Sequence, residues 1–185
     1  MISITKCFRP ICVGHILEDV QPCNMVHGHS LDIELDIRMP YGDFKGGVEG
    51  NRYVVELSRI KPVERVVRRM FDHKFLVDKD GAQTVELMRQ LLVVNPAKVL
   101  VDWVALPCAP TIENLAVLVW AIASCVLFDW DLGQRSIEAR VSETSSSWAA
   151  FDGFQGTVDA LPPKIREFVT FNCQMVSTPD FGLDN

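Results

Sequence analysis

Residues 27–39 alternate between apolar and charged side chains, and this pattern constrains the fold more strongly than any other stretch of the chain. A period of two residues indicates a half-buried β-strand, with one face toward a core and the other toward solvent. The apolar series is Leu31, Ile33, Leu35, Ile37 and Met39, and the charged series is Asp32, Glu34, Asp36 and Arg38. His27 and His29 precede the apolar series in the same phase. Both imidazoles are therefore expected on the protected face.

Two imidazoles spaced in this way can share one metal ion, and neutral imidazole is a common zinc ligand. Residues 2–15 also have strand character, interrupted by a proline, and His15 has the phase of the apolar residues there. If the two strands are adjacent, His15, His27 and His29 supply three ligands from one sheet face. Three protein ligands leave a fourth position for water or substrate, as in catalytic zinc sites. The alternative interpretation is a set of hydrogen-bonded core histidines.

Length, charge and cysteine content exclude several classes of protein. A chain of 185 residues corresponds to one ordinary domain. Its net charge of -6 argues against a nucleic-acid-binding surface. The six cysteines form no CxxC pair, which argues against a disulfide scaffold or a four-cysteine zinc site. No signal peptide is recognisable, and the apolar run within 115–128 is too short to span a bilayer. We therefore expect a cytoplasmic protein with no membrane or nucleic-acid partner.

Two amphipathic or apolar stretches predict helices. Ile60, Val63, Val67 and Met70 recur at helical spacing, and Pro62 is tolerable in that helix only within the first turn. Thr111 is a good N-cap for a second helix that continues through residue 127. Glu113 lies in its first turn, where a carboxylate interacts favourably with the helix dipole. The second helix is apolar nearly all round, so it should be covered by the sheet or by another subunit.

A later strand carries a carboxylate where an apolar residue is expected. Its inward series is Ile137, Ala139, Val141 and Glu143. Because an unpaired buried carboxylate is costly, Glu143 is expected to face a pocket that supplies hydrogen-bond donors. Residues 98–104 read as one more strand, and residues 161–185 as a surface extension beyond a single domain of residues 1–160. This order of elements predicts an α+β fold with the helices on one face of the sheet.

Four short motifs then occur in a characteristic order. They are Cys23-x-x-x-His27-Gly28-His29-Ser30, Phe71-Asp72-His73-Lys74, Pro110-Thr111-Ile112-Glu113-Asn114-Leu115-Ala116 and Val141-Ser142-Glu143-Thr144. Together with His15 they resemble the family of 6-pyruvoyltetrahydropterin and 6-carboxytetrahydropterin synthases over roughly residues 4 to 151. The resemblance implies the tunnelling fold (T-fold), an antiparallel sheet with two helices on one face. Three subunits would join their sheets into a barrel, two barrels would stack into a homohexamer, and zinc-containing active sites would lie between subunits.

The resemblance also assigns roles to individual residues. The zinc ligands would be His15, His27 and His29. Cys23 would be the general base or acid that moves protons on the substrate side chain, with Asp72 and His73 as its relay partners. Without the resemblance, Cys23 would be a small buried hydrophobic residue and the Asp72–His73 pair an ordinary helix end.

The substrate pocket follows from the same resemblance. Glu143 would anchor the pterin by accepting hydrogen bonds from its guanidine-like edge, in agreement with its place in an apolar series. Thr111 and Glu113 would line the pocket, although Glu113 could equally be only a favourable charge at a helix start.

Two reactions occur in the family, both on 7,8-dihydroneopterin triphosphate. One eliminates triphosphate to give 6-pyruvoyltetrahydropterin. The other also releases acetaldehyde and leaves 6-carboxytetrahydropterin, a precursor in queuosine biosynthesis. The gap of three residues between Cys23 and His27 favours the carboxy branch, because animal-type pyruvoyl enzymes usually have a longer gap. A zinc hydrolase and a pterin-binding protein without turnover remain alternatives.

Overall fold

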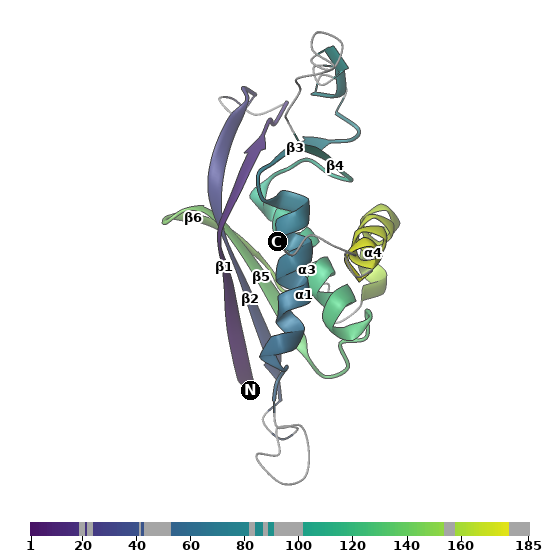
Figure 1. The fold of residues 1–185 in the computed structure, drawn as a ribbon. Coiled ribbons are helices and arrows are strands. Elements are labelled where there is room, and N and C mark those ends of the chain that lie inside the picture. Colours follow the sequence, from purple (N-terminus) through teal and green to yellow (C-terminus); the bar gives the residue numbers. More distant parts are fainter. Residues whose placement is uncertain are drawn as a thin grey trace, which may run out of the picture.

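The computed structural model describes residues 1–18, 21, 24–40, 42, 53–81, 84–86, 89–90, 102–153 and 158–177. Its centre is a six-stranded sheet with the order β4-β3-β1-β2-β5-β6 (Figure 1). The strands are β1 (Ile2–His15), β2 (His27–Met39), β3 (Lys74–Asp78), β4 (Trp103–Leu106), β5 (Ser136–Thr144) and β6 (Ser147–Phe151). The two strands predicted at the start of the chain are confirmed with their expected bounds, and they are the two longest strands described.

The sheet is mixed, although the part that carries the histidines is antiparallel. β2 pairs antiparallel with β1 and with β5, and β5 pairs antiparallel with β6. By contrast, β3 runs parallel to β1 and β4 runs parallel to β3. The register of β1 shifts between Phe8 and Ile11, around the proline that the sequence marked as an interruption. Of the strand expected over 98–104, only 103–104 fall within β4, and 98–101 lie outside the described residues.

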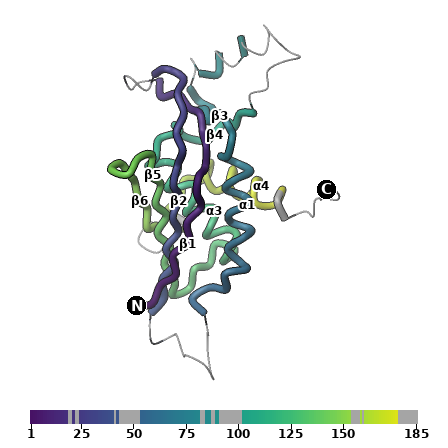
Figure 2. The backbone as a smooth tube through the Cα atoms, turned by 60° about the vertical axis from the view of Figure 1, so that its left-hand side comes forward, coloured from purple at the N-terminus to yellow at the C-terminus, as the bar shows by residue number. Residues whose placement is uncertain are grey.

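Two α-helices, α1 (Leu57–Phe71) and α3 (Ile112–Phe128), lie against one face of the sheet, and a third, α4 (Pro163–Ser177), packs on their outer side (Figures 1 and 2). α3 contacts β5 and β6 on one side and α1 and α4 on the other, which explains why its sequence is apolar all round. None of the described helices is long and apolar enough to cross a membrane.

Helix α1 corrects one expectation about Pro62. The helix begins at Leu57, so Pro62 lies in its second turn and not in the first. Proline has no N–H, and the hydrogen bond that residue 62 would donate to the carbonyl of Ser58 is therefore missing. The first turn is held by another contact, since the Arg59 guanidinium donates to the Leu127 carbonyl at 2.9 Å, at the end of α3. This anchor makes an early helix start possible despite the proline.

Helix α4 was not expected, because residues 161–185 read as a surface extension. Leu161, Ile165, Val169 and Cys173 are all buried, three of them one helical turn apart along α4. They pack against α3 and α1, so this part of the C-terminal segment belongs to the core.

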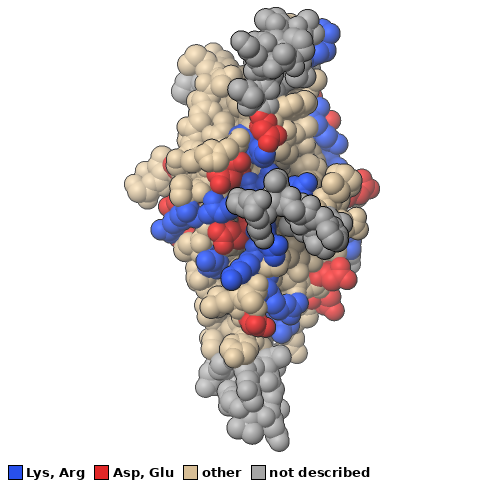
Figure 3. Space-filling view, in the orientation of Figure 1, with Lys and Arg blue, Asp and Glu red and all other residues tan. Residues whose placement is uncertain are grey.

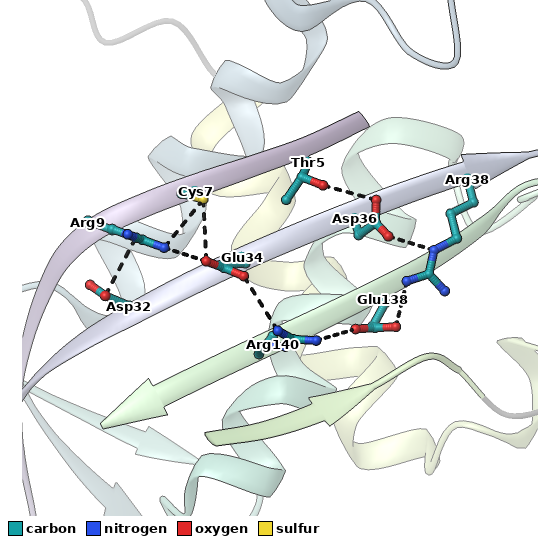
Figure 4. A network of polar contacts seen from close by, with 9 residues as sticks. All are labelled: Thr5, Cys7, Arg9, Asp32, Glu34, Asp36, Arg38, Glu138 and Arg140. Carbon is teal, nitrogen blue, oxygen red and sulfur yellow. Dashed lines mark hydrogen bonds and ion pairs between the residues drawn. The ribbon is translucent and has the colours of Figure 1, made fainter. Parts of the chain in front are cut away.

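The sheet face away from the helices carries a network of paired charges (Figure 4). Arg38 on β2 donates to Asp36 at 2.6 Å and to Glu138 of β5 at 2.8 Å. Arg9 on β1 pairs with Glu34 across the strands. The charged series of residues 27–39 therefore lies on the open face, as predicted. Acidic and basic side chains are also interspersed over the side of the molecule seen in Figure 3.

Candidate metal centre and active site

Three histidines meet at one end of the β1–β2 pair. His15 ends β1 and lies directly opposite His27, which begins β2, and His29 follows two residues later. The ring centroids of His15, His27 and His29 are 4.5 to 5.1 Å apart. One ring nitrogen of each lies within 4.8 Å of those of the other two. The structure thus brings together the three side chains that the sequence predicted as ligands.

Backbone carbonyls fix the orientation of two of the three rings. The Nδ1 atom of His15 lies 2.7 Å from the Pro110 carbonyl oxygen, and the Nδ1 atom of His27 lies 2.8 Å from that of Met25. A carbonyl oxygen only accepts hydrogen bonds, so both Nδ1 atoms must carry a proton. In neutral rings both Nε2 atoms are then bare acceptors, and they face each other at 3.0 Å. Two lone pairs at that distance repel unless a proton or a metal ion lies between them, and a metal ion would bind both.

Burial favours the neutral form of the innermost imidazole. His15 is only 3% exposed. Burial lowers its pKa below the usual value, and the neighbouring His27 and His29 lower it further, whereas the hydrogen bond to the Pro110 carbonyl acts in the opposite direction. A neutral ring is the form that binds a metal ion, so the environment of His15 favours ligation.

Glu143 reaches the same site from the neighbouring strand. Its Oε1 atom lies 3.8 Å from Nε2 of His29, and both side chains are about one-fifth exposed, at 22% and 23%. The carboxylate thus continues the inward series of β5 into the space beside the histidines, as expected. At that position it can accept hydrogen bonds from a ligand that approaches the three rings.

The turn before α3 supplies the carbonyl that holds His15. The Thr111 hydroxyl oxygen accepts a hydrogen bond from the Asn114 backbone N–H at 3.3 Å, which confirms Thr111 as the N-cap. The Asn114 side chain donates to the Ala109 carbonyl at 2.9 Å and closes the same turn. Thr111 lies one residue from the Pro110 carbonyl, whereas Glu113 is exposed in the first turn of α3. The helix start is therefore coupled to the position of His15.

Asp72 and His73 lie elsewhere in the same chain. The Asp72 carboxylate accepts from the Cys12 backbone N–H at 3.0 Å and from Arg68 at 3.0 Å, and it is 4.0 Å from Nε2 of His73. The His73 backbone N–H donates to the Cys12 carbonyl at 2.6 Å, and the His73 side chain is 82% exposed. Asp72 thus binds the end of α1 to β1.

His73 faces the side of the sheet opposite to the three histidines. It lines a surface hollow of about 340 Å³ together with Cys12 and Gly14. These two residues alternate along β1 with Val13 and His15, so they point to the open face of the sheet. The His73 side chain and the predicted metal ligands of one chain are therefore on opposite faces. Cys23 lies outside the described residues.

Sequence reasoning did not find three backbone groups that organise these sites. They are the carbonyls of Met25 and Pro110 and the N–H of Cys12. A pattern of side chains in the sequence does not reveal which backbone carbonyl or N–H group will bind a functional residue. Pro110, before the N-cap of α3, did indicate the turn whose carbonyl binds His15.

Comparisons with known proteins agree with this architecture. Residues 3–153 match the sequence model of the family described as 6-pyruvoyl tetrahydropterin synthase. No curated protein matches the chain. An uncharacterized protein from Wolinella succinogenes has a similar structure, with a TM-score of 0.60 and 15% identity over 83% of this chain and 98% of that one.

Two solved enzymes share the fold as well. The 6-pyruvoyl tetrahydropterin synthase of Plasmodium falciparum gives a TM-score of 0.56 and 14% identity, over 82% of this chain and 98% of that one. The corresponding enzyme of Plasmodium vivax gives 0.55 and 14%, over 83% and 99%. At these identities the likeness is one of fold.

Proposed function

Because the chain belongs to the 6-pyruvoyl tetrahydropterin synthase family, we propose that it is a zinc-dependent lyase of the carboxy branch. It would convert 7,8-dihydroneopterin triphosphate to 6-carboxytetrahydropterin, with release of acetaldehyde and triphosphate. The observation that carries the proposal is the set of His15, His27 and His29, whose ring nitrogens converge beside a carboxylate. The gap of three residues between Cys23 and His27 favours the carboxy branch.

The histidine set fits a zinc ion in donor type and spacing. Ligands at 2.0–2.1 Å in a tetrahedral site are about 3.3 Å apart, close to the 3.0 Å between Nε2 of His15 and Nε2 of His27. The third ligand would be His29. A zinc ion held there would act as a Lewis acid on the hydroxyl groups of the substrate side chain.

The remaining side chains would hold the substrate and move its protons. Glu143 would accept hydrogen bonds from the guanidine-like edge of the pterin, beside the metal ligands. The Thr111 hydroxyl oxygen already accepts from the α3 backbone, and its O–H group can still donate to a ligand. Cys23 would exchange protons with the substrate side chain through Sγ, and the His73 imidazole would relay them.

The position of His73 supports an active site shared between subunits. Since His73 and the three histidines of one chain lie on opposite sheet faces, the His73 that completes a site would come from another copy. Among the described strands, β4 and β6 lie at the two edges of the sheet, and an edge strand is a place where a strand of another copy could join. We therefore propose a homo-oligomer, and a hexamer of two stacked trimers is the assembly that the family resemblance implies.

Mixed oligomers test this arrangement. His15→Ala and His73→Ala should each abolish turnover. Unfolding and refolding the two variants together should restore part of the activity, because some sites then receive both intact side chains. A mixture that stays inactive while its subunits exchange would contradict a shared site.

Product analysis tests the reaction itself. Zinc-loaded protein is supplied with 7,8-dihydroneopterin triphosphate, and acetaldehyde is measured alongside the pterin product. Acetaldehyde with a 6-carboxy product supports the proposal. A 6-pyruvoyl product without acetaldehyde assigns the chain to the other branch, and tight pterin binding without any product indicates a binding protein.

A pair of cysteine variants tests whether turnover depends on the Cys23 thiol and not on any other cysteine of the chain. Cys23→Ala should lose turnover while it retains bound zinc and its thermal stability. Cys7→Ser is the matched control, because Cys7 is exposed on the charged face of the sheet and should be dispensable. Full activity in Cys23→Ala would refute the assigned role.

A further inference from the structure

Helix α4 lies beyond residues 3–153, the part of the chain that matches the family, yet it is firmly packed. Its inner face is buried against α3 and α1. The Arg69 guanidinium of α1 also donates to the carbonyl of Met175 near the end of α4, at 3.2 Å. The helix is therefore an addition to the matched fold with a defined position.

Two cysteines meet where this added helix crosses α3. Cys125 of α3 is half-buried, and Cys173 of α4 is 6% exposed. Their side chains lie within hydrogen-bond contact of each other. This hydrogen bond lowers the pKa of Cys125 and, together with burial, raises that of Cys173. Cys125 is also the more exposed of the two residues, so a small oxidant reaches its sulfur more easily.

A cavity gives small molecules access to the pair. It has a volume of about 580 Å³ and lies between the three helices. Its walls include Arg59 and Pro62 of α1, Cys125 and Val126 of α3, and Thr170 and Cys173 of α4. Both sulfur-bearing residues thus line one space.

We propose that Cys125 and Cys173 are a redox modification site, which hydrogen peroxide converts to a reversible disulfide that ties α4 to α3. Thiols already in hydrogen-bond contact need only a small movement to reach bonding distance. The site is independent of the metal centre and of the proposed lyase reaction.

Hydrogen peroxide forms the disulfide in two steps. The Cys125 thiolate attacks one oxygen of hydrogen peroxide, the O–O bond breaks, and hydroxide leaves with a sulfenic acid on Cys125. Cys173 then attacks the Cys125 sulfur, the S–O bond breaks, and the departing hydroxide takes the Cys173 proton as water. In sum, two thiols and one peroxide give one disulfide and two water molecules, and thiol reductants reverse the change.

Peptide mapping of the full-length protein tests the proposal. After peroxide treatment, trapping of free thiols and non-reducing trypsin digestion, we expect residues 99–135 linked to residues 167–185. The first peptide contains Cys108 as well as Cys125, and the second contains only Cys173. Cys108→Ser should keep the link, and Cys125→Ser should lose it. Dithiothreitol should restore both peptides.

Thermal unfolding provides a second readout that does not depend on the variants' activity. Oxidation should raise the melting temperature of the wild-type protein by up to about 10 °C, because the disulfide closes a long loop. It should not raise that of Cys173→Ser.

The proposal is overturned if oxidised wild-type protein lacks the linked peptides while other cysteines are modified. It is also overturned if Cys125→Ser still forms them, since Cys108 would then be the partner. Because the first of these results needs no variant, a misfolded mutant cannot obscure the answer.

Discussion

With zinc bound as proposed, replacing His15 by alanine should remove most of the stabilisation that the metal gives to the protein. A ligand present at 100 times its dissociation constant stabilises the folded state by about 2.7 kcal/mol. For 185 residues the entropy of unfolding is about 0.4 kcal/mol/K, so the melting temperature should rise by about 7 °C. If the loss of one of three ligands weakens binding about 100-fold, the same zinc concentration gives only about 0.4 kcal/mol, or about 1 °C.

The assay is thermal unfolding of chelator-treated protein with and without zinc chloride, each variant being compared with its own metal-free form. That baseline matters because the Pro110 carbonyl loses its donor in His15→Ala, which costs about 1–3 kcal/mol whether or not zinc is present. His73→Ala is the control. Its side chain is 82% exposed on the opposite face of the sheet, so it should keep the full shift.

Two results would refute the reasoning. The first is a shift of about 7 °C that persists in His15→Ala, which would place the bound zinc elsewhere. The second is a wild-type protein that zinc does not stabilise at any concentration, which would leave the two facing Nε2 atoms without the proposed cation.

Two substitutions probe the surroundings of the site, and an alkylation rate probes the environment of Cys108. Glu143→Gln should raise KM for the pterin while zinc affinity stays within a few-fold of wild type, and an unchanged KM would remove its anchoring role. Thr111→Val should lower the free energy of unfolding by about 1 kcal/mol, because the N-cap hydrogen bond from Asn114 is lost, and it should also weaken zinc binding. Denaturant and zinc titrations measure the two effects, with Thr111→Ser as the conservative control. Burial, with a smaller contribution from Asp78, raises the pKa of Cys108 to about 11. The alkylation of Cys108 should therefore be slow at pH 8 and become faster until the pH passes about 11. An alkylation rate that levels off near pH 9 would contradict this environment.

The histidine site could be predicted because strand parity is a local property. His27 and His29 share the phase of the apolar residues that follow them, and that phase alone determines which face they occupy. The prediction for His15 needed one more assumption, the adjacency of the two strands, and the observed pairing of His15 with His27 confirms it. Glu143 followed from the same argument on a third strand.

Expectations about helices were less reliable, because helix limits depend on tertiary contacts. Proline at position 62 suggested that α1 starts close to it, but the contact of Arg59 with the end of α3 supports an earlier turn. In α4 the residues Ile165, Val169 and Cys173 have helical spacing, but the pair of prolines before them favoured an irregular surface segment in the sequence analysis.

The separation of His73 from the three histidines is the feature that no local pattern could have revealed. His73 was predicted as a catalytic partner from its motif, whereas its face of the sheet depends on how β3 pairs with β1. Its backbone N–H is bound to Cys12, and the adjacent Asp72 is held by Cys12 and Arg68, so the backbone of His73 is fixed beside β1. A side chain cannot reach through a sheet to the opposite face. If His73 acts in the reaction, it therefore acts on the substrate of another subunit, and assembly of the oligomer becomes a condition for catalysis.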